Sequence, residues 1–119
     1  MVSVAAMVIK QKSINGMQVL SLIGKLDIFS KNSFNETIAY HREQGIKGLI
    51  LDLRGVTFID SVGIGALVSA AKTFKQMKGK VVLVNPQETV KQILEQMNII
   101  QLIPIFTADE TYSSFSTLS

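Results

Sequence analysis

The sequence predicts a single α/β domain over residues 1–119, built on a mixed central sheet with a parallel core and packed helices. Strand-like segments rich in Val, Ile and Leu alternate with helix-like segments, and this alternation implies right-handed crossovers between parallel strands. The first two strands are the exception, because Asn15-Gly16 between them is a strong signal for a tight antiparallel hairpin. A chain of 119 residues that is 47% hydrophobic can bury a core without disulfide or metal support.

The first half of the chain predicts a hairpin, a helix and a buried strand. Residues 8–12 and 17–23 have the composition of strands and flank the hairpin turn. A helix is expected over residues 30–44, because the following Gly45 suits the left-handed conformation that ends many helices. Nearly continuous apolar residues over 48–53 predict a strand buried on both faces. The residues expected on the buried face of the helix are Phe34, Ile38 and His41.

A second helix is expected to begin at Ser61 and to be closed by Gly79. The apolar run over residues 81–84 then predicts another buried strand. Ser69 lies deeper in the helix than Ser61 and is expected to be inaccessible. The residues expected to face inward from this helix are Leu67, Val68, Ala71, Phe74 and Met77.

The remainder of the chain predicts a helix, a short strand and a final helix. Asn85 is interpreted as the N-cap of the first of these, with Pro86 in its first turn and Glu88 as a capping-box partner. A short strand is expected within residues 103–106, and a small helix over residues 109–118. The residues expected on one face of the helix after Asn85 are Val90, Ile93, Leu94 and Met97.

The composition excludes several classes of function. There are no cysteines, which removes disulfide frameworks, cysteine nucleophiles and thiolate metal sites, and His41 is the only histidine. The net charge of +3 is mild and the lysines are spread along the chain, so no nucleic-acid surface is expected. No apolar run approaches the roughly 20 residues of a membrane helix. We therefore expect a cytoplasmic protein without a membrane span, a bound metal or a cofactor.

The most informative stretch is Phe58 to Leu67, because it places Ser61 where a buried strand gives way to a helix. The first N–H groups of a helix have no intrahelical acceptor, so Ser61 is either a cap or a phosphate site. Gly63 and Gly65 should each cost about 1 kcal/mol relative to alanine inside the helix. Either tight packing on the sheet or close approach of a partner to the Ser61 hydroxyl would offset that cost.

Two carboxylates are expected near Ser61 on an exposed rim of the sheet, because Asp27 and Asp60 both lie in loops that follow strands. In principle this pair could hold magnesium or act as acid and base, or the two side chains could simply shape their loops. The stretch Ile59 to Gly63 lacks the first glycine of a hydrolase elbow. The chain also lacks the acidic residue of a dinucleotide site and the Gly-Lys-Ser/Thr of a Walker loop. These absences argue against an enzyme.

Three segments together resemble the sulfate transporter and anti-sigma factor antagonist (STAS) domain. They are Gly24-Lys25-Leu26-Asp27, the run from Leu49 to Leu53, and the stretch from Phe58 to Leu67, which contains an Asp-Ser-x-Gly-x-Gly motif. The resemblance covers nearly the whole chain, with the same order of elements. It implies the STAS fold and a non-catalytic regulator of the anti-sigma factor antagonist type.

The resemblance also implies the roles of individual residues. Ser61 takes the position of the serine that an anti-sigma factor with serine kinase activity phosphorylates, and a serine phosphatase reverses the modification. Asp27 takes the place of the aspartate beside that serine, and Asp60 directly precedes it. When unphosphorylated, such proteins bind the anti-sigma factor and free its sigma factor. The residues assigned to the surrounding partner-binding neighbourhood are Val62, Gly63, Ile64 and Gly65.

Two alternatives remain open from the sequence. The same fold serves as a scaffold in stress-signalling assemblies and as a module in lipid or anion transport, so the chain could be a constitutive subunit of such an assembly. A small nucleotide-binding protein is the third class. Val62 also departs from the small polar residue of many relatives, which makes the surface after Ser61 more apolar and bears on partner choice.

Overall fold

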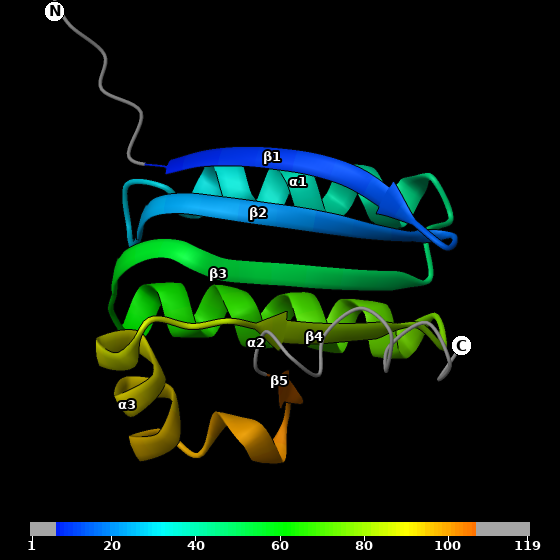
Figure 1. The fold of residues 1–119 in the computed structure, drawn as a ribbon. Coiled ribbons are helices and arrows are strands. Elements are labelled where there is room, and N and C mark those ends of the chain that lie inside the picture. Colours follow the sequence, from blue (N-terminus) through cyan, green and yellow to red (C-terminus); the bar gives the residue numbers. More distant parts are fainter. Residues whose placement is uncertain (1–6, 107–119) are drawn as a thin grey trace, which may run out of the picture.

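The computed structural model describes residues 7–106, which form one mixed sheet flanked by helices (Figure 1). The sheet has five strands in the order β1-β2-β3-β4-β5. The strands are β1 (Met7–Ile14), β2 (Met17–Leu26), β3 (Gly48–Ile59), β4 (Lys80–Val84) and β5 (Ile105–Phe106). The helices are α1 (Lys31–Glu43), α2 (Ser61–Gln76), α3 (Glu88–Gln96) and the short 3-10 turn η1 (Ile99–Gln101).

The pairing of the strands confirms the predicted mixed sheet. Strands β1 and β2 are antiparallel, while β2, β3, β4 and β5 pair in parallel with their neighbours. The turn between β1 and β2 has positive φ at both Asn15 (50°) and Gly16 (81°), as the hairpin signal requires. The helix predicted over residues 109–118 lies outside the described residues.

Strand β3 is longer than its apolar run suggested, since it continues from Leu53 to Ile59. It keeps its partner β2 over this extension, where Ile23 pairs with Gly55 and Leu26 pairs with Ile59. A Cβ on Gly55 would crowd the Leu22 carbonyl, so glycine permits this close pairing, and two register shifts in β2 accompany it. The predicted end of the strand at Leu53 is therefore too early.

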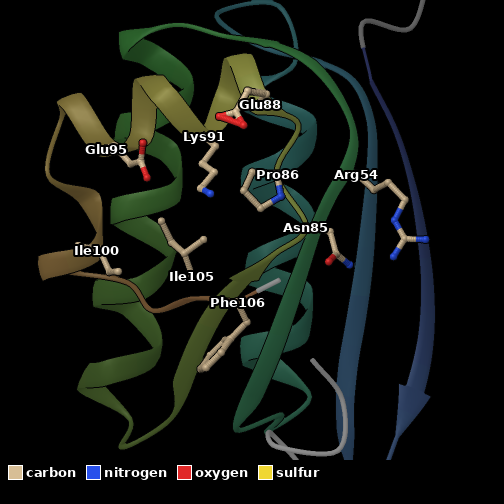
Figure 2. A pocket seen from close by; sticks show the side chains of 9 residues that line it. All are labelled: Arg54, Asn85, Pro86, Glu88, Lys91, Glu95, Ile100, Ile105 and Phe106. Carbon is tan, nitrogen blue, oxygen red and sulfur yellow. The ribbon is translucent and has the colours of Figure 1, made fainter. Parts of the chain in front are cut away.

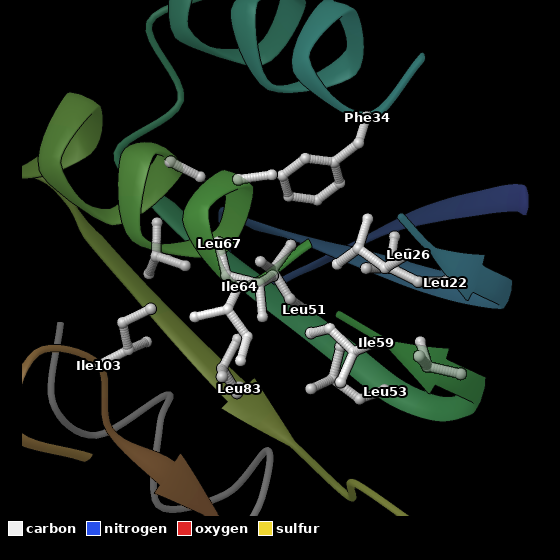
Figure 3. Packing of buried hydrophobic residues seen from close by; sticks show 14 of the residues in the cluster. Leu22, Leu26, Phe34, Leu51, Leu53, Ile59, Ile64, Leu67, Leu83 and Ile103 are labelled. Atoms are coloured by element: carbon white, nitrogen blue, oxygen red, sulfur yellow. The ribbon is translucent and has the colours of Figure 1, made fainter. Parts of the chain in front are cut away.

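Helices α1 and α2 cover one face of the sheet and close the main core (Figure 3). Phe34 of α1 and Leu67 of α2 are fully buried there above the sheet residues Leu51 and Leu83. A smaller apolar cluster occupies the sheet's other face. Its buried members are Met17, Val19, Ile50, Val82 and Val84.

The predicted inward faces of the helices are largely confirmed. On α2, Leu67 and Phe74 are buried as expected, and Val68 and Ala71 are partly buried and pack against the main core. Met77, the residue just beyond the helix, is only partly buried. Apolar residues surround much of this helix, so packing against α1 and the sheet decides which side is covered. The residues buried on α2 besides Leu67 and Phe74 are Gly63, Ile64, Ala66 and Ala70.

Most of the residues predicted to face inward from α1 and α3 are also buried or partly buried. On α1 all three predicted residues are buried, and His41 is only 3% exposed, with Nδ1 2.9 Å from the Thr37 carbonyl oxygen. On α3, Val90 and Leu94 are buried and Ile93 partly so, whereas Met97 is 53% exposed. Met97 is the residue just beyond the last turn of α3, where the helical periodicity no longer applies.

The predicted N-cap of α3 is also wrong. Asn85 has φ of 56°, and its backbone N–H donates to the Phe106 carbonyl (3.0 Å), beyond the end of β4. The helix begins at Glu88, so Gln87 occupies the cap position and Pro86 precedes the first turn. Between Met7 and Phe106, no helix is long and apolar enough to cross a membrane.

The end of α2 gives a test of local strain. The N–H groups of Lys78 and Gly79 donate to the carbonyls of Lys75 (3.0 Å) and Phe74 (2.7 Å), so the left-handed residue is Lys78, with φ of 62°. Lys78→Gly should raise the free energy of unfolding by up to about 1 kcal/mol by relieving that strain. Lys72→Gly, in the exposed helix interior, should lower it by about 1 kcal/mol. Urea unfolding of both variants tests this, and equal destabilisation would contradict it.

Candidate functional site

The candidate site lies where β3 ends and α2 begins. Asp60 is extended there, and its Oδ1 accepts a hydrogen bond from the backbone N–H of Gly63 (2.9 Å). Asp60 is therefore the N-cap of α2, and the interpretation of Ser61 as the cap is wrong. Ser61 is exposed as the first residue of the helix. Within the described chain its hydroxyl makes no hydrogen bond, which leaves it available to a partner.

The two glycines of the motif have different reasons to be glycine. A Cβ on Gly63 would overlap the Leu26 carbonyl oxygen and come within 2.9 Å of Cγ1 of Ile59. Gly63 therefore lets the first turn of α2 press against the end of β2. Gly65 is exposed, and a Cβ placed on it would meet nothing within 4 Å. Tight packing thus explains Gly63, while Gly65 leaves a bare patch on the outer face of α2.

Asp27 was predicted to lie on an exposed rim, and this prediction is wrong because the residue is only 8% exposed. Its Oδ1 accepts hydrogen bonds from the backbone N–H groups of Phe29 (3.0 Å) and Ser30 (3.3 Å). The Ser30 hydroxyl in turn donates to the Lys25 carbonyl (2.7 Å) and accepts from the N–H of Asp27 (3.0 Å). Asp27 therefore holds the loop between β2 and α1, and the adjacent Leu26 carbonyl places that loop against the start of α2.

A groove of about 350 Å³ runs beside Ser61 between α1 and α2. Lys31 of α1 forms part of one wall, and Ser61, Gly65 and Ser69 lie along α2 at a spacing of four residues, which places them on one face. Ser69 is exposed in this groove, so the expectation that it would be inaccessible is wrong. The other residues that line the groove are Asn35, Val62 and Ala66.

Of the predicted partner-binding residues, some face the groove and others face the core. Val62 is partly exposed and lines the groove, but Ile64 is 6% exposed and packs in the main core beside Leu67 and Leu83 (Figure 3). Ile64 therefore contributes to the position of the helix rather than to its outer surface. The residues from Val62 to Val68 are all apolar or glycine, so the sequence did not indicate which of them would face outward.

An exposed apolar rim lies at the same edge of the sheet and was not identified from the sequence. Phe29 is 85% exposed in the loop after β2, and Ile28 beside it is also exposed. Phe58, near the end of β3 and paired with Lys25, is a third exposed large side chain. Apolar side chains exposed near one another often mark a protein interaction surface. We call these three exposed residues, Ile28, Phe29 and Phe58, the apolar rim.

Both carboxylates of the site are engaged with the backbone of their own loops. Asp27 and Asp60 each use a carboxylate oxygen to hold backbone N–H groups of their own loops. Residues 7–106 contain no group of three or more His, Cys, Asp or Glu side chains that could hold a metal ion. The chemistry offered by this edge is therefore an uncommitted hydroxyl beside a groove and an apolar rim.

Comparison with known proteins identifies the family. The sequence model of the STAS domain matches residues 8–111. The anti-sigma-B factor antagonist of Bacillus subtilis is 28% identical over 96 residues, which cover 81% of this chain and 86% of that protein.

Solved structures share the fold at lower identity. The anti-sigma factor antagonist SpoIIAA in its unphosphorylated form aligns with a TM-score of 0.72 and 20% identity, covering 87% of this chain and 91% of that chain. The murine anion transporter Slc26a9 aligns with a TM-score of 0.74 and 23% identity, covering 91% of this chain but 19% of the transporter. The same fold therefore occurs both in an anti-sigma factor antagonist and in part of an anion transporter.

The contrast between Gly63 and Gly65 can be tested directly. Gly63→Ala should lower the free energy of unfolding by about 1–3 kcal/mol, because the methyl group must displace the Leu26 backbone. Gly65→Ala should leave it unchanged or raise it by up to about 1 kcal/mol, since alanine is the better helix former and the space is open. Chemical denaturation of both variants measures this, and a Gly65→Ala variant as unstable as Gly63→Ala would refute the packing account.

Proposed function

This chain belongs to the STAS domain family, and from that premise we propose that it is an anti-sigma factor antagonist controlled by phosphorylation of Ser61. In its unphosphorylated form it binds an anti-sigma factor that is also a serine kinase, and a sigma factor is thereby freed. A serine phosphatase restores the binding form. The chain itself carries out no catalysis, works in the cytoplasm and binds neither nucleic acid nor a cofactor.

The observation that carries this proposal is the free hydroxyl of Ser61. A kinase needs an acceptor that is exposed and not held by another hydrogen bond, and Ser61 meets both conditions because Asp60 caps the helix in its place. Gly65, one turn further along, leaves open space on the same face of α2. These features support the approach of a partner's active site to the hydroxyl.

The surroundings of Ser61 support a switch in partner binding. The apolar rim lies at the same edge of the sheet, and an apolar contact loses affinity when a charged group must be desolvated beside it. Phosphorylation adds about −1.5 to −2 charges at pH 7 and the bulk of the phosphate. The modified surface therefore docks less well, while the fold beneath it is unchanged.

A second candidate function is a constitutive scaffold or transport subunit, which the shared fold of the Slc26a9 anion transporter favours. Such a module would need the fold and its apolar surfaces but not a modifiable hydroxyl. The two candidates are separated by whether the phosphorylation state of Ser61 changes affinity for the partner.

The position of the phosphate is the first test. Incubation with the cognate kinase and ATP should place a single phosphate on Ser61, as located by peptide mass spectrometry. Ser69 is the matched alternative, because it is exposed in the same groove but lies within α2 rather than at its first residue. Ser69→Ala should be phosphorylated as fast as the wild type, and Ser61→Ala should not be phosphorylated. A phosphate on Ser69 in the wild-type protein would refute the assignment.

The affinity for the anti-sigma factor is the second test. Ser61→Ala should bind as tightly as the wild type and keep its stability within about 0.5 kcal/mol, since the hydroxyl caps nothing. Ser61→Asp should bind more weakly because it adds a single charge, and phosphoserine should bind most weakly. Calorimetric titration of the four forms gives the order. Equal affinities would exclude the switch and favour the scaffold.

A further inference from the structure

A second cavity lies at the carboxyl ends of β4 and β5, away from the groove beside Ser61. It has a volume of about 840 Å³, which is in the range of small-molecule sites. Its walls come from α3, from η1, from the middle of β3 and from residues at or just after the ends of β4 and β5 (Figure 2). No residue of the groove beside Ser61 or of the apolar rim lines this cavity.

Asn85 is the polar group that this cavity leaves unsatisfied. Both its side-chain oxygen and its side-chain nitrogen are buried, and neither has a hydrogen-bond partner in the described chain. A buried amide without partners lowers stability, so its presence needs an explanation. The side chain lines the cavity (Figure 2). A ligand that offers both a donor and an acceptor would satisfy the two atoms together.

Arg54 of β3 supplies a positive charge at the same end of the cavity as Asn85 (Figure 2). Its side chain forms no ion pair with any residue of the described region. The nearby Asp52 uses Oδ1 to accept a hydrogen bond from the backbone N–H of Arg54 (3.0 Å). A guanidinium group without a carboxylate partner is suited to a bidentate contact with an incoming carboxylate.

The opposite end of the cavity carries both apolar side chains and the Glu95 carboxylate (Figure 2). Ile100 of η1 lies there, and Ile105 of β5 lies between it and Asn85 (Figure 2). Lys91 of α3 falls between Glu88 and Glu95 on the same helical face, at spacings of three and four residues, so its charge offsets part of theirs. The net positive end of the cavity is therefore the one with Arg54 and Asn85.

We propose that this cavity binds a small organic acid that carries a secondary amide and an apolar body, of which an N-acylated amino acid is the simplest example. The carboxylate contacts Arg54, the amide pairs with both polar atoms of Asn85, and the apolar body lies against Ile105 and Ile100. The inference is independent of the phosphorylation of Ser61, because none of these residues belongs to the groove or the apolar rim.

The first test compares three probes on the full chain. N-acetyl-L-leucine should give saturable shifts of the Asn85 side-chain amide and the Ile105 amide in NMR titrations, with a dissociation constant of about 1 mM or below. N-acetyl-L-leucinamide lacks the carboxylate, and isocaproate lacks the amide. Each should bind at least about five-fold more weakly, because each leaves one of the protein's polar groups without a partner. No saturation by N-acetyl-L-leucine, or equal binding of all three probes, would overturn the proposal.

The second test uses variants that keep the backbone relaxed. Asn85→Gly removes the amide at a position with φ of 56°, which glycine adopts freely. Asn15→Gly makes the same change at φ of 50° in the hairpin turn and is the matched control. N-acetyl-L-leucine should bind Asn85→Gly at least about five-fold more weakly and Asn15→Gly normally.

The cation is tested in the same way. Arg54→Gln should weaken the binding of N-acetyl-L-leucine but leave the binding of N-acetyl-L-leucinamide unchanged. Arg42→Gln on α1 should change the affinity for neither probe. Wild-type affinity in both Asn85→Gly and Arg54→Gln would refute the site. The ranking of the three probes on the unmodified chain decides the question even if one variant fails to fold.

Discussion

The contact between Gly63 and the Leu26 carbonyl is the constraint on which the rest of the site depends. Helix α2 starts directly after β3, and β3 pairs in parallel with β2, so the first turn of α2 has to pass the end of β2. Only a residue without Cβ fits at that crossing. With Gly63 and Ile64 held inward, the helical period turns Ser61 and Gly65 outward. The exposure of the hydroxyl is thus a consequence of backbone packing.

The Ser61 hydroxyl stays free because two aspartates accept the hydrogen bonds of the nearby backbone N–H groups. Asp60 caps α2 and Asp27 holds the loop before α1, so each carboxylate satisfies backbone N–H groups that would otherwise lack acceptors. Losing such a cap costs about 1 kcal/mol, and a serine that supplied it would be less available to a kinase. The pair of aspartates near the serine therefore has a structural role that is independent of any contact with a partner.

The sequence predicted those features that depend on local signals. The hairpin follows from Asn15-Gly16, and the order of strands and helices follows from their apolar patterns, because both depend on near neighbours along the chain. The predictions that failed depend on tertiary contacts. Asp27 was expected on the surface, but the loop folds over its side chain. Asparagine is a common N-cap residue, but Asn85 has a left-handed backbone and its N–H donates a hydrogen bond to the Phe106 carbonyl. These two features place Asn85 before the helix. Phe29 carries no sequence signal for exposure. The four-residue spacing of Ser61, Gly65 and Ser69 could have placed Ser69 on the same exposed face as Ser61.

The position of Ser61 decides whether a phosphate would act on the fold or on binding. At the first residue of α2 the added negative charge faces the positive end of the helix, an interaction that typically stabilises by about 0.3–1 kcal/mol. At a docking surface the same charge must be desolvated or repelled, and a loss of about 1.4 kcal/mol already weakens binding ten-fold. The two effects have opposite signs, so the modification can abolish docking without unfolding the protein. A phosphate at the other end of α2 would instead oppose the helix dipole and act on both together.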